Sequence, residues 1–292
     1  MATSLAQAPA STGRANTRSA PDRAAAQPAG RLRQSLATAA PPVAVFILFV
    51  IAWQVFCTVL KIPHYLLPKP TDVVIAAGDK ADILATALLS TFTSALIGLG
   101  LAVICGMSAA LVMSQSKLVE RSIYPFAILL QTIPLIAYAP LIVIWVGAGM
   151  NAVVTISFII ALFPMISNTI AGLSSTDHNL VSMFELYNAN WWQRMVKLKL
   201  PAALPYIMTG LRISSGLAVI GAIIGEFIAG IGGLRGGLGY VIVSAANRLE
   251  MSYLFAAALC SSVLGLVIFI GISMVSARFL RHWHESAVQR EN

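Results

Sequence analysis

Few side chains in this chain of 292 residues have the types and spacing that catalysis or metal binding requires. The three cysteines, Cys57, Cys105 and Cys260, lie far apart in apolar stretches, where cysteine usually serves as a small buried residue. No lysine follows a glycine, so the Gly-Lys pair of a Walker A phosphate-binding motif is missing. The glycine-rich segment 230–239 has Arg235 where a dinucleotide-binding fingerprint needs its third glycine. We therefore expect a chain that is not an enzyme, with no catalytic residue, no metal site and no bound cofactor.

Glu226 is the one acidic residue inside the long apolar segments. An ionisable group there is costly, so it indicates a solute pathway or a pairing with another span; the alternative is a solvated site near the outer interface. Pro134 and Pro140 should break or kink an apolar segment, either to expose backbone groups to a water-filled path or only for packing. Gln131 and Tyr138 could supply hydrogen bonds there. The candidate translocation-pathway residues are Gln131, Pro134, Tyr138, Pro140 and Glu226.

The composition predicts a polytopic membrane protein. Charged residues make up 10% of the chain and apolar residues 58%, whereas soluble domains have about 25% charged residues. Residues 122–176 form an uncharged run of 55, enough for two membrane spans of about 20 residues each. The net charge of +8 does not indicate nucleic-acid binding, because the basic residues lie in the N-terminal tail and beside apolar runs rather than on one face.

We expect an all-α fold with about six transmembrane helices, at about 41–60, 86–113, 124–146, 152–173, 206–229 and 253–277. The chain should comprise a disordered basic cytoplasmic tail (1–38), the first span with an external connector (39–85), a transmembrane domain (86–280) and a cytoplasmic tail (281–292). The glycine-rich residues 230–239 are expected to be a flexible connector. Six spans place both termini on one side, which carries 14 Lys and Arg against 5 on the other, so both termini should be cytoplasmic.

The polar segment between the fourth and fifth spans, 174–201, is the strongest functional candidate. Ser174 with Asp177, and Asn190 with Gln193, have the three-residue spacing of helix capping pairs. Asn188 lies in between and tolerates left-handed geometry. The segment therefore predicts two short cytoplasmic helices joined by a tight turn.

Two further features of this segment concern its ends and its surface. Pro201 and Pro205 are expected to break the chain before the fifth span. Its aromatic residues suit docking into a groove on a partner, or alternatively an aromatic belt in the lipid interface; they are Phe184, Tyr187, Trp191 and Trp192.

This segment resembles the EAA loop of binding-protein-dependent ABC importer permeases, which commonly reads Glu-Ala-Ala, has Gly four residues after the second Ala and ends in Leu-Pro. Aligned on the Leu200-Pro201 pair, the family's Glu falls at Ser182 and its Gly at Asn188, so the signature is degraded. The resemblance implies an ATPase-coupling loop that includes Ser182, Phe184, Glu185, Leu186, Tyr187, Asn188, Ala189, Trp192, Leu200 and Pro201.

Other stretches are similar to the permeases for nitrate, sulfonates, taurine, thiamine precursors and riboflavin. They are the proline-rich 134–149, Gly210-Leu-Arg212, Gly225-Glu226-Phe227 and the terminal 281–286, and the resemblance covers about 86–287. The loop and the tail look more like the thiamine-precursor and riboflavin branch. The solute implied is therefore a thiamine precursor, riboflavin or a similar heterocycle.

The resemblance implies a multi-pass permease subunit in a bacterial inner membrane. Its partners would be a second permease copy (the same chain or a paralogue), two cytoplasmic ATPase subunits that hold ATP and Mg, an external substrate-binding protein and the surrounding lipid. Transport would proceed by alternating access, with the 182–194 segment as a lever. The alternative is a proton-coupled secondary transporter, which should have several intramembrane acids or histidines, whereas the spans hold essentially one, Glu226. A membrane-embedded enzyme would need a convergent catalytic cluster, which the sequence lacks.

Overall fold

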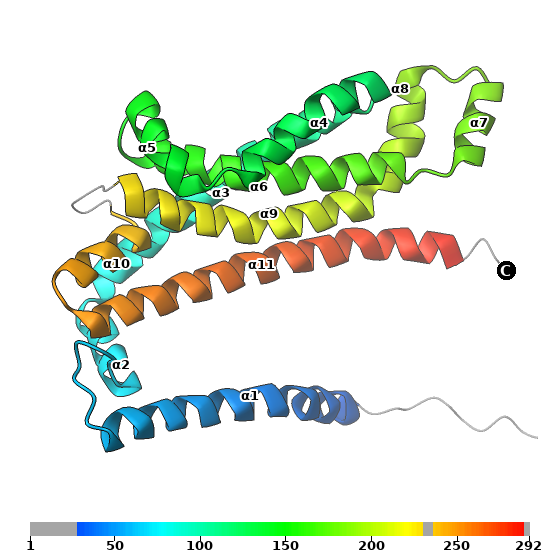
Figure 1. Ribbon diagram of the computed structural model, residues 1–292. Coiled ribbons are helices and arrows are strands. Elements are labelled where there is room, and N and C mark those ends of the chain that lie inside the picture. The colour runs from blue at the N-terminus through cyan, green and yellow to red at the C-terminus, as the bar shows by residue number, and fades with distance from the viewer. Residues whose placement is uncertain (1–27, 230–235, 289–292) are drawn as a thin grey trace, which may run out of the picture. The chain divides into compact units, whose positions relative to one another are not determined.

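A computed structural model describes the backbone of residues 28–229 and 236–288, and the regular structure in these ranges is helical (Figure 1). The helices are α1 (Pro28–Val59), α2 (Pro70–Asp79), α3 (Ala81–Met113), α4 (Lys117–Thr132), α5 (Leu135–Val146), α6 (Met150–Ser174), α7 (His178–Leu186), α8 (Trp191–Arg194), α9 (Leu200–Ala229), α10 (Leu238–Asn247) and α11 (Met251–Val288). A π-helical turn, Met195–Lys199, joins α8 to α9. The chain divides into two compact units, Met1–Ala52 and Trp53–Asn292, and every contact described below lies within the second.

The first helix begins earlier than expected. Because α1 starts at Pro28, the prediction of a disordered tail over 1–38 is wrong for 28–38, and residues 1–27 lie outside the described part. Proline is favoured at the first position of a helix, and the alanine-rich sequence that follows has high helix propensity.

Four helices are long and apolar enough to cross a membrane, namely α3, α6, the continuous helix Trp191–Ala229 and the Met251–Leu280 part of α11. They correspond to the second, fourth, fifth and sixth expected spans. The first expected span contains a shorter apolar stretch, Val43–Val59, within α1. The third is divided into α4 and α5. The prediction of an all-helical polytopic membrane fold is confirmed.

Proline breaks one expected span and fails to break another. α4 ends at Thr132, and Pro134 precedes α5, so the break predicted at Pro134 is confirmed. Pro140 lies inside α5 without ending it. The break predicted at Pro201 and Pro205 is wrong, because both lie inside α9.

The π-helical turn directly before α9 supplies the physical reason for this continuity. Local π adjustments and hydroxyl side chains can satisfy the backbone groups that a proline leaves unbonded in a membrane helix. The Thr209 hydroxyl donates to the Pro205 carbonyl at 3.0 Å, which adds a bond in this stretch but does not replace the one that the missing Pro205 N–H would make to the Pro201 carbonyl. Pro201 and Pro205 therefore lie within one helix that runs from Trp191 to Ala229.

Small residues let α6 pack closely against α9 on one side and α3 on the other. A Cβ on Gly221 of α9 would lie 2.8 Å from the Ser157 Cα of α6, and one on Gly225 would lie 3.0 Å from the Val153 Cα. The Ser157 hydroxyl donates to the Ala218 carbonyl at 2.8 Å, and the Ser214 hydroxyl donates to the Ala161 carbonyl at 2.7 Å. Such close contacts and interhelical hydrogen bonds are typical of packing between membrane helices.

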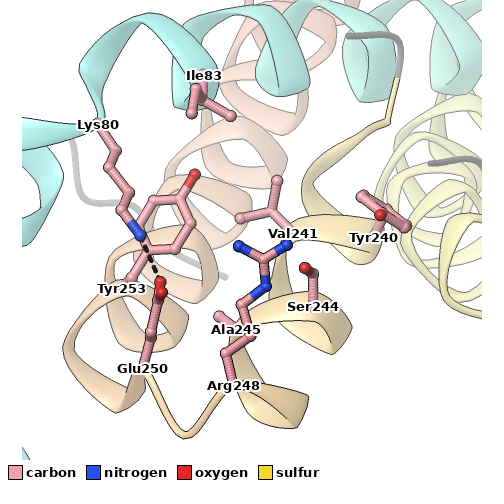
Figure 2. A pocket seen from close by; sticks show the side chains of 9 residues that line it. All are labelled: Lys80, Ile83, Tyr240, Val241, Ser244, Ala245, Arg248, Glu250 and Tyr253. Atoms are coloured by element: carbon pink, nitrogen blue, oxygen red, sulfur yellow. Dashed lines mark hydrogen bonds and ion pairs between the residues drawn. The ribbon is translucent and has the colours of Figure 1, made fainter. Parts of the chain in front are cut away.

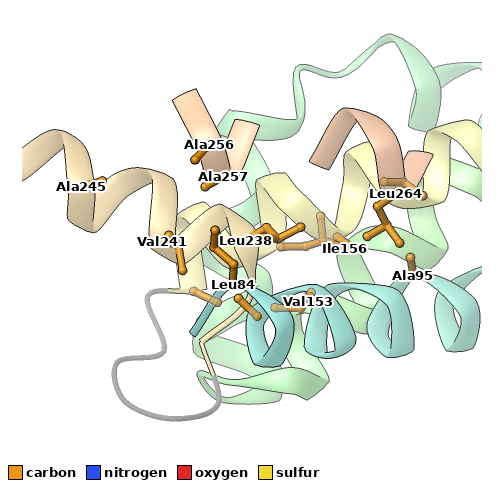
Figure 3. Close-up of a cluster of buried hydrophobic side chains, with 14 of the residues drawn as sticks. Leu84, Ala95, Val153, Ile156, Leu238, Val241, Ala245, Ala256, Ala257 and Leu264 are labelled. Atoms are coloured by element: carbon orange, nitrogen blue, oxygen red, sulfur yellow. The ribbon is translucent and has the colours of Figure 1, made fainter. Parts of the chain in front are cut away.

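The largest buried apolar cluster brings together helices that are far apart in the chain (Figure 3). Leu84 and Ala95 come from α3, Val153 and Ile156 from α6, and Leu238 from α10. Val219 and Ala222 of α9 and Ala256, Ala257 and Leu264 of α11 also belong to it. The short helix α10 is therefore part of the packed helical core.

We predict that Gly221→Ala destabilises the protein by about 1–3 kcal/mol, because the new methyl group has no room against the Ser157 backbone. Gly216→Ala on the same helix is the matched control, since nothing lies within 4 Å of its added Cβ, and alanine raises helix propensity there. Thermal unfolding of the two purified variants in detergent makes the comparison. Equal melting temperatures would contradict the close α6–α9 contact.

Candidate functional site

The segment between α6 and α9 contains the candidate coupling residues. Its first helix, α7, begins at His178, and the Asp177 carboxylate accepts a hydrogen bond from the Asn179 N–H at 2.9 Å. The expectation that Ser174 caps this helix is wrong, because Ser174 is the last residue of α6. Asp177 alone provides the cap that the spacing had assigned to the pair.

A tight turn follows α7, and Asn188 adopts the left-handed conformation there with φ of 52°. The Ala189 N–H donates to the Phe184 carbonyl, and the Asn188 N–H donates to the Glu185 carbonyl, both at 2.9 Å. These two bonds form a Schellman motif, which usually has glycine and sometimes asparagine at the left-handed position. The prediction that Asn188 makes this turn is confirmed, and asparagine takes the place where the EAA pattern has glycine.

The second helix of the segment begins with a capping box. The Gln193 N–H donates to the Asn190 side chain at 2.8 Å, and the Asn190 N–H donates to the Gln193 side chain at 3.0 Å. This confirms the predicted Asn190–Gln193 pair. The expectation of a separate short helix is wrong, because α8 continues through the π-helical turn into α9 as one helix, Trp191–Ala229.

An ion pair between Glu185 of α7 and Arg194 of α8 links the two sides of the turn. The tip between them is exposed, with 83% of Leu186 and 81% of Tyr187 accessible. Trp192 is also exposed. Of the remaining candidates, Ser182, Phe184, Ala189, Leu200 and Pro201 are half-buried. The segment is therefore a fixed turn with Leu186 and Tyr187 exposed at its tip and Trp192 exposed beside it.

The candidate pathway residues occupy two places. Gln131 and Pro134 lie at the junction of α4 and α5, and Tyr138 and Pro140 lie in α5. Gln131, Pro134 and Pro140 are exposed, whereas Tyr138 is half-buried against the main apolar cluster. Glu226 lies in α9, and no hydrogen bond among the described residues joins it to the other four.

Glu226 is 3% exposed, so the solvated alternative does not fit this structure. Its carboxylate accepts hydrogen bonds from the Thr91 hydroxyl of α3 and from the Gly239 N–H of α10, each at 2.9 Å. The acid is therefore hydrogen-bonded to another long helix, α3, and to α10. The sequence did not predict helix α10. Residues 230–235 lie outside the described part, and the rest of the expected flexible connector precedes or begins α10.

A pocket of about 240 Å³ lies between α10 and the first residues of α3 and α11 (Figure 2). Lys80 forms an ion pair with Glu250, and its Nζ lies 4.3 Å from the centre of the Tyr253 ring. Tyr240, Ser244 and Arg248 line the side formed by α10 and the residue that follows it. Sequence spacing does not predict this pocket, because its two sides are more than 150 positions apart in the chain. Within the described ranges, no three His, Cys, Asp or Glu residues lie where they could hold a metal ion.

Comparison with known families identifies most of this helical region. The sequence model of the family described as "Binding-protein-dependent transport system inner membrane component" matches residues 98–281. The formylaminopyrimidine transport permease protein ThiX of Halalkalibacterium halodurans is 34% identical over 79% of this chain and 91% of its own length. The riboflavin transport system permease protein RibX of Chloroflexus aurantiacus is 31% identical over 84% and 90%. A probable ABC transporter permease protein of Haemophilus influenzae is 32% identical over 78% and 91%.

Solved structures share the fold at lower sequence identity. A chain of the MetNI methionine ABC transporter, solved in inward-facing conformations, has a TM-score of 0.58 and 15% identity, over 67% of this chain and 95% of that one. A chain of an amino acid ABC transporter has a TM-score of 0.56 and 16% identity, over 71% and 97%. These similarities concern the helical architecture alone.

We predict that Asn188→Val opens the turn, whereas Asn188→Gly leaves it formed. A left-handed conformation costs a branched residue about 1–2 kcal/mol, so exchange of the Ala189 amide hydrogen should accelerate about tenfold or more. Hydrogen exchange with mass spectrometry measures this in both variants. Asn179→Val, at an exposed position in α7, is the control. Unchanged exchange in Asn188→Val would contradict the Schellman motif.

Proposed function

The chain belongs to the binding-protein-dependent transport system inner membrane components, and on that basis we propose how its transport is driven and what it carries. As a member it is a multi-pass inner-membrane protein and the non-catalytic permease component of an ABC importer. The family binds no cofactor, and ATP hydrolysis occurs on a separate chain. The alternative of a proton-coupled secondary transporter is therefore wrong. A binding protein and an ATPase are implied as partners.

The 182–194 segment docks into a groove on a cytoplasmic ATPase subunit. The observation that carries this assignment is the fixed turn with Leu186 and Tyr187 exposed at its tip. Exposed apolar and aromatic side chains on a rigid support lose little conformational entropy on binding, which is the usual character of an interface anchor. An aromatic belt does not explain why a Schellman motif, a capping box and the Glu185–Arg194 ion pair all fix the same short segment.

The continuous helix Trp191–Ala229 makes this segment a lever. A push on α8 is carried into α9 because no loop separates them. In the second unit, α7 and α8 lie at one end and α10 lies at the other (Figure 1). Closure of the ATPase subunits on ATP thus shifts α9 and the helices packed against it, which produces alternating access.

We further propose the domain boundaries of the chain and its orientation in the membrane. Residues 39–85 are the first span and an external connector, 86–280 the transmembrane domain and 281–292 a cytoplasmic end. Both termini are cytoplasmic, because 14 Lys and Arg then lie inside and 5 outside. A second permease copy, either this chain or a paralogue, completes the pathway. Gln131, Pro134, Tyr138 and Pro140, at the break between α4 and α5, remain its candidate lining residues.

The solute is a nitrogen heterocycle of the size of a thiamine precursor or riboflavin. Two of the relatives described above are named for formylaminopyrimidine and riboflavin, and both align with most of this chain. Both names denote ring systems with nitrogen atoms. The binding protein would present this solute at the external end of the permease.

We predict that Leu186→Ala and Tyr187→Ala each reduce co-purification of the ATPase subunit at least tenfold, because an interface anchor contributes about 2 kcal/mol or more. Quantitative pull-down from detergent-solubilised membranes measures the loss. Leu118→Ala is the control, since Leu118 is an exposed apolar residue in α4, outside the loop. Full co-purification and full transport in both loop variants would contradict the coupling assignment.

We predict that cells expressing the complete transporter accumulate labelled formylaminopyrimidine or riboflavin, and that taurine does not compete. Uptake into right-side-out membrane vesicles should stop with vanadate, which traps ABC ATPases. It should persist with a protonophore. Accumulation of taurine alone would contradict the solute assignment. Loss of uptake with the protonophore alone would contradict ATP coupling.

A further inference from the structure

The surroundings of Glu226 in α9 satisfy one of its two buried carboxyl oxygens, Oε2, whereas Oε1 has no hydrogen-bond partner among the described residues. A carboxylate in an apolar interior is expensive unless other groups donate hydrogen bonds to it. Its Oε2 accepts from the Thr91 hydroxyl of α3 and from the Gly239 N–H at the start of α10. The Leu238 N–H donates to the same Thr91 hydroxyl at 2.9 Å. One acid and one threonine thus satisfy two of the backbone N–H groups that begin α10.

These bonds replace an ordinary helix cap. Gly237 precedes α10 and has no side chain that could accept hydrogen bonds from its first turn. The first N–H groups of a helix have no partner within the helix and carry a partial positive charge, which favours a carboxylate. Here the carboxylate comes from a different helix, so the cap also connects α10 to α9.

The glycines at the start of α10 are shaped to this carboxylate. A Cβ on Gly237 would overlap the Glu226 carboxylate, and a Cβ on Gly239 would overlap the Ile223 carbonyl of α9. Both glycines are buried. The backbone of 237–239 can therefore approach α9 closely only because it lacks side chains there.

We propose that Glu226 and Thr91 form a clasp that fixes α10 to α9 and α3, so that α10 moves with the outer part of α9. Glu226 is thereby a positioning residue whose function is to hold α10. In the chain itself, α9 and α10 are connected only through residues 230–237. The clasp provides a direct link between the two helices.

The position of the clasp gives it a role in transport, and this part rests on the proposed function. Residues 191 and 226 are separated by about 50 Å along one helix, at 1.5 Å per residue. The coupling segment is at one end of that helix, and the clasp is near the other. α10 and the residue after it supply Tyr240, Ser244 and Arg248 to the pocket in Figure 2. Movement of α9 therefore reaches the external pocket through the clasp.

The test follows a thiol introduced by Ala245→Cys on α10, in a chain whose three native cysteines are replaced by alanine. Ala245 is 2% exposed within the main apolar cluster, so a water-soluble thiol reagent reaches this position only when α10 separates. Labelling should be slow in the parent and at least about tenfold faster in Glu226→Ala, because two buried hydrogen bonds that hold α10 are lost. Glu226→Gln keeps an oxygen that can accept both bonds and should label within about threefold of the parent.

Matched variants separate a clasp from a general loss of stability. Thr91→Val should accelerate labelling as Glu226→Ala does, and Thr91→Ser should restore the parent rate. Ser214→Ala removes a buried hydroxyl-to-carbonyl bond elsewhere on α9 and should leave the rate unchanged. The clasp is overturned if Glu226→Ala or Thr91→Val labels at the parent rate, or if Ser214→Ala accelerates labelling equally. If Glu226→Ala does not fold, the Thr91 variants decide.

A second comparison tests the link to transport, in the transporter assembled with its ATPase subunits. Trapping nucleotide with vanadate should leave the slow labelling rate of the parent unchanged, because the clasp makes α10 move with α9, whereas the labelling rate of Glu226→Ala should depend on nucleotide. Faster labelling of the parent with trapped nucleotide would overturn the joint movement of α9 and α10, whereas the proposed function is decided separately by the co-purification and uptake measurements. The labelling rates measured without nucleotide would then still decide whether the clasp exists.

Discussion

The close approach of α6 and α9 is the contact on which the rest of the structure depends. Gly221 and Gly225 let the backbone of α9 lie against Ser157 and Val153 of α6. Within lipid, apolar side chains gain little by leaving the bilayer for a helix interface, so close packing and short interhelical hydrogen bonds supply the association. The Ser157 hydroxyl adds one such bond, to the Ala218 carbonyl. A single long helix held in this way can transmit force along its length.

Polar chemistry is concentrated near the two ends of that helix, and it differs between them. Near Trp191, a capping box, a Schellman motif and the Glu185–Arg194 ion pair fix a solvent-exposed turn. Near Ala229, Glu226 is buried and bonded to Thr91 and Gly239. Exposed ion pairs contribute little to stability, so backbone bonds hold the turn. Buried hydrogen bonds are worth more, because breaking one leaves an unsatisfied group in an apolar interior. The first end is therefore suited to recognition and the second to anchoring.

Local sequence rules predicted those features that neighbouring residues determine. Asn188, Asn190 and Gln193 make the turn and the capping box because the bonds involved span five residues or fewer. Pro134 ends α4 because the residue before a proline avoids helical geometry. The predictions for Pro201 and Pro205 failed because membrane helices tolerate internal prolines where local π adjustments and neighbouring helices accommodate them, and a π-helical turn directly precedes α9. α10 was missed, since its glycines resemble a connector until the carboxylate of Glu226 is brought against them. The pairing of Glu226 with Thr91 joins residues 135 positions apart, which periodicity cannot reveal.

The central claim is that the coupling turn and α9 move as one body when the partner ATPase binds nucleotide. Spin labels introduced by Asn179→Cys and Ile220→Cys occupy exposed positions on α7 and on α9, and pulsed electron resonance measures the distance between them. In the assembled transporter, this distance should be the same with and without trapped nucleotide, while the distance between the Asn179→Cys labels of two permease copies changes. A nucleotide-dependent change within one chain would contradict the lever.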